Sequence, residues 1–186
     1  MNKILKYRKQ LHDFKSFEEK INRFNLINTS PEKNIIFSKK IIIESKKINI
    51  NLLKGVFNLD EPIGIKIYRN CMINYLNKNY YAVFDGIPFI EYYYQLKSKE
   101  NNISISKLDK SGQDSYSESY YTLSTILDRL KNNNISIDSF DYYLFSNNEG
   151  CLNLRNKFAH GEIRNNFALY STYILMSISK ILMRSK

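Results

Sequence analysis

Apolar side chains recur at helical spacing from the start of the chain. Over residues 3–26 they fall every three or four positions, with Lys, Arg and Glu between them, which predicts an amphipathic helix. The segment Thr29–Glu32 predicts the start of a second helix over 31–47, with Ser30 as its cap. The run Ile41–Ile43 also suits a strand. We expect a helix there, because no comparable strand-like segment is available to pair with it.

Two further helices are expected in the middle of the chain. One starts at Leu59–Pro62, with Asp60 as its cap, and ends where an Asn-Lys-Asn run interrupts the apolar stripe. The next covers 80–98. Pro88 lies inside it, and a proline lacks the backbone N–H that a helix needs, so we expect a kink near residue 85.

The C-terminal half is predicted to be a long polar loop followed by helices. The loop covers 99–118, which is rich in Ser, Asn and Asp. The helical segments are 119–131, 137–145 (capped by Asp138 or Ser139) and 151–184, with a turn at 147–150. Because the connections between helices are short, neighbouring helices are expected to be antiparallel. The pattern therefore predicts an all-α fold, an antiparallel helical bundle.

The composition limits the class of protein. The chain has 186 residues, 43% of them hydrophobic, and a formal charge of +10. The charge is compatible with a polyanionic partner such as RNA, but the Lys residues are scattered and Ile, Asn and Tyr are also abundant, as in AT-rich coding sequences. No apolar run approaches about 18 residues, and the start lacks a secretory signal. Cys71 and Cys151 lack the spacing of a zinc or redox motif. We therefore expect a cytoplasmic protein without a membrane span, metal or cofactor.

The segment Gly150–Gly161 differs in composition from the rest of the chain. It reads Gly-Cys-Leu-Asn-Leu-Arg-Asn-Lys-Phe-Ala-His-Gly and contains His160, one of only two histidines. His160 lies between two small residues and follows the pair Arg155 and Asn156. Because Gly161 costs up to about 1 kcal/mol of helix stability relative to Ala, we expect a packing or functional reason for it.

The spacing of these side chains leaves two arrangements open. On a regular helix Asn156 and His160 share a face, whereas Arg155 and His160 point about 140° apart. Either the helix begins within the motif, so that Arg155 lies on the loop side, or a second subunit brings its own copy of the motif. Both arrangements would gather an imidazole, a guanidinium and an amide around one phosphate.

These groups suit cleavage of RNA without a metal. An imidazole exchanges protons near neutral pH, so His160 can take the proton of a 2′-hydroxyl or protonate a leaving 5′-oxygen. Arg155 can bind the phosphate and its transition-state charge, and the Asn156 amide can orient either partner. The expected product is a 2′,3′-cyclic phosphate. The Arg-x4-His spacing alone is a weak signal, because a histidine that only supports a helix has the same spacing.

The longer string resembles a family signature. The run from Asn153 to Gly161, Asn-Leu-Arg-Asn-x-x-Ala-His-Gly, is similar to the Arg-x4-6-His motif of the HEPN superfamily, and to one branch whose C-terminal domains end in Gly-x-Asn-Leu-Arg-Asn-x-x-Ala-His-Gly. Ile87–Glu91 resembles that branch's Pro-x-hydrophobic-Glu helix, and residues 108–127 resemble its polar loop and next helix. The resemblance covers about residues 60–184. Gln95 stands where the branch often has an Arg.

The resemblance implies an architecture and a role. The architecture is a HEPN-like antiparallel helical bundle over 59–186, preceded by an N-terminal helical extension over 1–58, that forms a homodimer through the motif helices. The role is an endoribonuclease that acts on RNA as a toxin or in anti-phage defence by abortive infection, with an antitoxin or defence-system protein as partner. Other members of the superfamily have lost catalysis and serve as RNA-binding or assembly modules, which is the alternative.

The resemblance also assigns roles to five residues. Arg155, Asn156 and His160 match the motif and would be catalytic. Lys157 would contact the RNA backbone, and Glu91 would face Arg155 next to the substrate.

Overall fold

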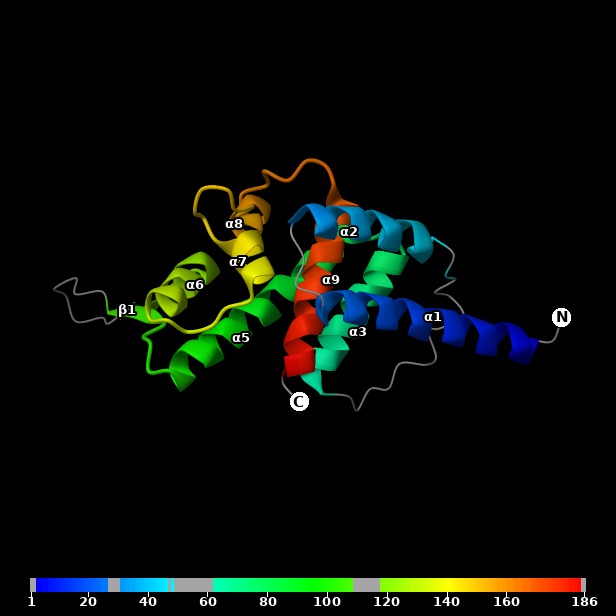
Figure 1. Ribbon diagram of the computed structural model, residues 1–186, viewed down its shortest axis with the longest axis horizontal. Helices are drawn as coiled ribbons and strands as arrows, with labels where there is room; N and C mark the ends of the chain where they lie inside the picture. Colours follow the sequence, from blue (N-terminus) through cyan, green and yellow to red (C-terminus); the bar gives the residue numbers. More distant parts are fainter. Residues whose placement is uncertain (1–2, 27–30, 47, 49–61, 109–117, 185–186) are drawn as a thin grey trace. The chain divides into compact units, whose positions relative to one another are not determined.

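The protein is predominantly helical in a computed structural model, which describes residues 3–26, 31–46, 48, 62–108 and 118–184 (Figure 1). The all-α class expected from the sequence is confirmed at this level. The chain divides into two compact units: unit 1 comprises Met1–Phe89 with Ile163–Lys186, and unit 2 comprises Ile90–Glu162. The boundary expected between residues 58 and 59 lies outside the described residues.

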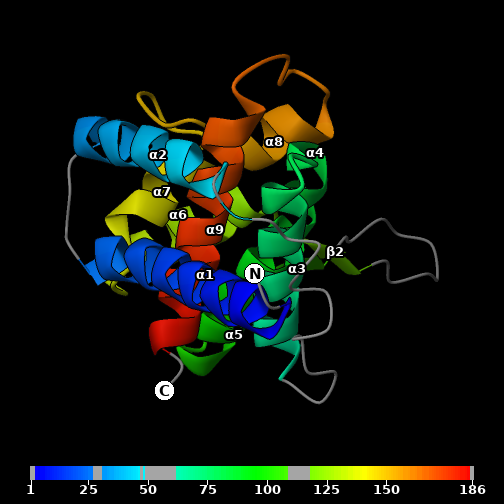
Figure 2. The same cartoon turned by 90° about the vertical axis from the view of Figure 1, so that its right-hand side faces the viewer.

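Unit 1 is built around the last helix of the chain, α9 (Phe167–Arg184). The other helices among the described residues of the unit are α1 (Lys3–Leu26), α2 (Pro31–Ser45), α3 (Ile63–Leu76), α4 (Tyr80–Val83) and the 3-10 turn η2 (Phe84–Gly86). Each of them contacts α9, and α9 lies among α1, α2 and α3 in both views (Figures 1 and 2). Every residue from Ser171 to Ser179 is buried, so α9 is the core helix of unit 1.

The expected second helix is confirmed, and α2 continues through the run Ile41–Ile43 that also suited a strand. Ser38, Ile41 and Ser45 are buried, at the three- and four-residue spacing of a helix face. The caps predicted at Ser30 and Asp60 lie outside the described residues.

Pro88 breaks the predicted helix 80–98, and the expected kink near residue 85 is confirmed. The chain forms α4, then the 3-10 turn η2, then α5 (Ile87–Glu100). The N–H of Ile87 donates to the Phe84 carbonyl, which Pro88 cannot reach because it has no N–H. The tighter turn satisfies that carbonyl and redirects the chain into α5.

The segment expected to be one long loop contains a short β-ladder, which corrects the expectation. β1 (Ser106–Leu108) pairs antiparallel with β2 (Glu118–Tyr120), with Ser106 opposite Tyr120. Residues 109–117 between the strands lie outside the described residues. Strands of three residues carry too little alternation to be recognised in a sequence.

The prediction of a single helix over 151–184 is wrong. The chain forms the short α8 (Leu154–Ala159), then a connection, then α9. Gly161 and Asn166 within this connection have positive φ, 68° and 59°, and a helix cannot continue through left-handed backbone.

The rest of unit 2 packs around α5 and two helices, α6 (Leu123–Asn132) and α7 (Ser139–Phe145). Asp138 caps α7, because its Oδ1 accepts the Phe140 N–H at 2.9 Å. The buried Tyr94 of α5 donates its hydroxyl proton to Asp141 of α7 at 2.6 Å. Burial raises the Tyr94 pKa well above its ordinary value, and the Asp141 carboxyl raises it further. This bond attaches α5 to α7.

Within the described ranges, no helix has both the length and the apolar character needed to cross a bilayer.

Candidate functional site

Two polar side chains of α6 hold the turn that precedes the motif. Ser124 and Asp128 are one helical turn apart. Asp128 Oδ1 accepts hydrogen bonds from the Tyr142 hydroxyl (2.8 Å) and from Asn148 Nδ2 (2.9 Å). Ser124 Oγ accepts the Asn147 backbone N–H at 3.0 Å and donates to the Asn147 side chain at 2.9 Å. The turn is therefore attached to α6 at two consecutive residues.

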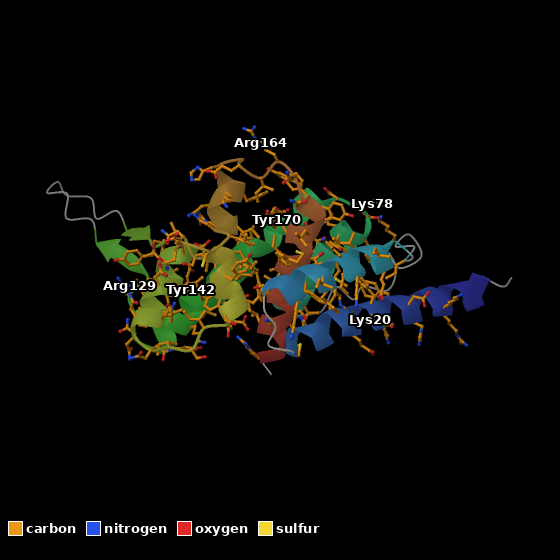
Figure 3. All side chains as sticks on the ribbon, turned by 45° about the horizontal axis from the view of Figure 1, so that its top comes forward. Lys20, Lys78, Arg129, Tyr142, Arg164 and Tyr170 are labelled. Carbon is orange, nitrogen blue, oxygen red and sulfur yellow. The ribbon has the colours of Figure 1, made fainter. Side chains whose placement is uncertain are left out.

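The Tyr142 ring also contacts a cation. The Lys131 ammonium lies 4.1 Å from the centroid of the Tyr142 ring, within the range of a cation–π contact. The Arg129 guanidinium makes the corresponding contact with Tyr121 at 4.7 Å. Figure 3 labels Arg129 on α6 and Tyr142 on α7, the two helices that this polar contact region joins.

Backbone hydrogen bonds carry the chain from the turn into α8. The Cys151 N–H donates to the Asn148 carbonyl (3.0 Å), and the Leu152 N–H donates to the Tyr143 carbonyl of α7 (2.8 Å). Asn153 then adopts a left-handed conformation, with φ 49° and ψ 43°, which Asn tolerates better than most residues. This single residue sets the direction in which α8 starts.

The C-terminal end of α8 is a Schellman motif. The Gly161 N–H donates to the Phe158 carbonyl (3.0 Å), and the Glu162 N–H donates to the Lys157 carbonyl (2.8 Å). This pattern requires a left-handed residue after the helix, and Gly161 supplies it with φ 68°. Gly161 is therefore explained by the backbone conformation that ends α8, and the packing reason expected for it is absent, because a Cβ at this position would meet no atom of the described residues within 4 Å.

Arg155 and Asn156 form a cluster with Glu91 at the first turn of α8. Arg155 Nη1 donates to Asn156 Oδ1 at 3.3 Å, and Arg155 Nε lies 3.8 Å from Glu91 Oε2 on α5. The Glu91 side chain is 18% exposed and the Arg155 side chain 35% exposed. The cluster thus presents a guanidinium that is held from two sides and remains accessible to an anion.

His160 and Lys157 lie at the other end of the same short helix. The His160 N–H donates to the Asn156 carbonyl at 2.9 Å, so His160 follows Asn156 by one turn although it is no longer within α8. Both side chains are exposed. In the described parts of the chain, neither side chain has a hydrogen bond or ion pair.

The position of α8 bears on the first of the two arrangements left open by the sequence, in which the helix begins within the motif. α8 begins within the motif, at Leu154, and Arg155 lies in its first turn. His160 lies beyond its last residue. Of the five candidate residues, the structure joins three through side-chain contacts, namely Arg155, Asn156 and Glu91.

The residues of α6 that hold the turn were not among those predicted from the sequence. Ser124 and Asp128 carried a weak signal, because both are polar residues at i and i+4 beside the apolar stripe of α6. Asn147 and Asn148 were expected in a turn, without a partner. The contacts between these four residues depend on how α6 meets the turn, which the sequence pattern does not contain.

Potential metal ligands do not gather in the described parts of the chain, where no three His, Cys, Asp or Glu side chains lie together. Cys71 is buried and Cys151 is half-buried, and both are free thiols. Burial raises the pKa of the Cys71 thiol to about 12, so this thiol stays protonated at neutral pH and does not act as a nucleophile.

No family model, curated protein or solved structure matches the chain.

Proposed function

We propose that the protein is a metal-independent endoribonuclease of the HEPN type that serves as a toxin or as an effector of anti-phage defence by abortive infection. The observation that carries the proposal is the accessible Arg155 guanidinium of α8, which contacts Asn156 and Glu91. The same helix is followed directly by the exposed His160. Arginine binds phosphate in a planar, bidentate way. The +10 charge favours approach of RNA.

In the proposed reaction the 2′-oxygen of RNA attacks the adjacent phosphorus. The P–O5′ bond breaks, which leaves a 2′,3′-cyclic phosphate and a 5′-hydroxyl. His160 takes the 2′-hydroxyl proton, and a protonated imidazole supplies the proton to the 5′-oxygen. Arg155 stabilises the charge that the phosphate oxygens gain, and Glu91 and Asn156 orient the guanidinium.

Two proton transfers suit two imidazoles, so we further propose a homodimer in which the motif helices of two copies share one site. Light scattering of the purified chain tests this proposal. A dimeric mass is expected, and a monomer that cleaves RNA would contradict the shared site. An antitoxin or another defence-system protein is the proposed partner that controls the activity.

The test of catalysis compares the wild type with His160→Ala and Arg155→Ala on labelled single-stranded RNA in the presence of EDTA. We expect His160→Ala to lower the cleavage rate about 10²- to 10⁴-fold, and Arg155→Ala about 10²- to 10³-fold. His12→Ala is the matched control, because His12 is the other histidine and is 84% exposed on α1. It should cut at the wild-type rate.

Two further results would contradict the proposed reaction. The first is a wild type that leaves RNA intact or that cuts no faster than both variants. The second is cleavage of a substrate with a 2′-deoxyribose at the scissile position, since that substrate lacks the attacking hydroxyl. Mass spectrometry of the products should find the cyclic phosphate.

One observation favours the alternative, a catalytically inactive RNA-binding or assembly module. In the described parts of the chain, no side-chain contact joins the His160 imidazole to the Arg155 cluster. RNA binding by the wild type without cleavage, weakened by Arg155→Ala but not by His160→Ala, would support this alternative.

A further inference from the structure

The solvent-facing side of α5 carries a row of three residues beside the proposed site. Tyr92 is 56% exposed and Leu96 is 38% exposed, and Lys99 is also exposed. They stand at i, i+4 and i+7, which places them in one row along the helix. The buried residues of α5, including Ile90, Tyr94 and Ser98, lie on a different side, so Tyr92 and Leu96 do not belong to the core.

This row begins at the phosphate-binding cluster. Tyr92 directly follows Glu91, whose Oε2 lies 3.8 Å from Arg155 Nε. Lys99 lies about 10 Å further along the helix axis, at about 1.5 Å per residue. Along α5 an exposed aromatic ring and an exposed aliphatic side chain thus lie between Glu91, which contacts the Arg155 guanidinium, and the cation Lys99.

We propose that Tyr92 and Leu96 form a stacking surface for a base of single-stranded RNA whose phosphates bind Arg155 and Lys99. Every base has a π-face that stacks on an aromatic ring, and cations along the groove follow the backbone. Tyr92 and Leu96 supply an exposed apolar surface, and Lys99 supplies a cation in the same row. The inference rests on the proposed function, because it extends the substrate path from Arg155.

The test measures RNA affinity in the His160→Ala background, which keeps the RNA intact. The probes are a labelled oligoadenylate and an abasic ribose-phosphate oligomer of the same length. We expect Tyr92→Ala to weaken oligoadenylate binding about five- to 150-fold and to leave binding of the abasic oligomer unchanged. Tyr92→Phe should retain most of the affinity, because it keeps the ring.

Two additional variants define the row. Tyr120→Ala is the matched control, because Tyr120 is 60% exposed and lies in β2 instead of the row; it should bind as the parent does. Lys99→Gln removes one phosphate contact, so the slope of log K against log salt should fall by about 0.7. Circular dichroism checks that each variant is folded.

Several outcomes would overturn the stacking surface. They are an unchanged oligoadenylate affinity in Tyr92→Ala, an equal loss for the abasic oligomer, or an equal loss in Tyr120→Ala. If the wild type cuts RNA and Tyr92→Ala binds normally, this inference fails and the proposed function stands. If the wild type neither binds nor cuts RNA, the proposed function fails as well. If the row instead binds a second copy of this chain, Tyr92→Ala should abolish dimerisation. That result would also overturn the inference.

Discussion

Two residues with left-handed backbone determine where the candidate side chains of α8 lie. Asn153 turns the chain immediately before the helix, and Gly161 ends it immediately after His160. Because α8 contains only Leu154–Ala159, we expect a change at either end to move Arg155 or His160 relative to the other.

The cost of a substitution at Gly161 should depend on how readily the new residue adopts a positive φ, and not on a steric clash of its side chain. A Cβ at this position meets no atom within 4 Å, so the cost of Gly161→Ala comes from φ 68° and is about 1 kcal/mol. Asn populates this conformation more readily, so Gly161→Asn should cost less. Urea unfolding measures both variants, with Glu162→Ala as an exposed control. Equal stability of Gly161→Ala and wild type would contradict the argument.

At the scale of elements, α6 acts as the support of the turn that leads into α8. Its Ser124 and Asp128 bind the side chains or backbone of Asn147 and Asn148. A short helix such as α8 is not stable alone, so its position depends on these contacts and on the Leu152 bond to α7.

Removal of the Asp128 carboxylate should destabilise this part of the protein. Asp128→Ala leaves the Tyr142 hydroxyl and the Asn148 amide without their shared acceptor, at an expected cost of about 1–3 kcal/mol. Asp128→Asn keeps one carbonyl acceptor and should cost less. Thermal unfolding measures both, and Glu100→Ala, an exposed carboxylate at the end of α5, is the control. If Asp128→Ala left the stability unchanged, the turn would not depend on its contacts with α6, which would contradict this prediction.

The helix α9 should be the most sensitive element of unit 1, because it is buried along most of its length. Ile174 is fully buried, whereas Ile36 on α2 is 58% exposed. Ile174→Ala should therefore lower the free energy of unfolding by about 2–5 kcal/mol. The matched Ile36→Ala should change it by less than about 0.5 kcal/mol. Similar effects of the two variants in denaturant titrations would contradict the central position of α9.

At the scale of the whole molecule, unit 1 contains titratable groups that keep their protons because they are buried. Burial raises the pKa of Tyr75 from its ordinary 10.0 to about 12, although its hydrogen bond with Thr172 lowers it. Burial likewise raises the pKa of Cys71 from 9.0 to about 12. Between these values the folded chain holds more protons than the unfolded chain.

Stability should therefore fall in alkali. As pH rises from about 9 to about 12, the unfolded thiol and phenol lose protons that the folded groups retain, so the free energy of unfolding decreases. Urea titrations at increasing pH measure this decrease. The double variant Cys71→Ala with Tyr75→Phe should reduce the slope, whereas Tyr120→Phe, which removes an exposed hydroxyl, should not. A flat profile would contradict the burial of these groups.

Most helices and the candidate residues follow from local patterns in the amino-acid sequence. Apolar periodicity is a local property, so the helix over 3–26, the helix predicted over 31–47 (observed at Pro31–Ser45) and the break at Pro88 followed from neighbouring residues alone. The composition of Gly150–Gly161 likewise singled out Arg155 and His160 without any knowledge of the fold.

The ends of those elements and the contacts between them depend on the folded chain. The division of the predicted helix 151–184 depends on left-handed backbone at Gly161 and Asn166, which side-chain periodicity does not report. The contact of Glu91 with Arg155 joins residues far apart in the sequence, and its geometry depends on how α5 and α8 are held within unit 2. Local patterns specify elements, whereas contacts between distant residues, such as Glu91 with Arg155, depend on packing.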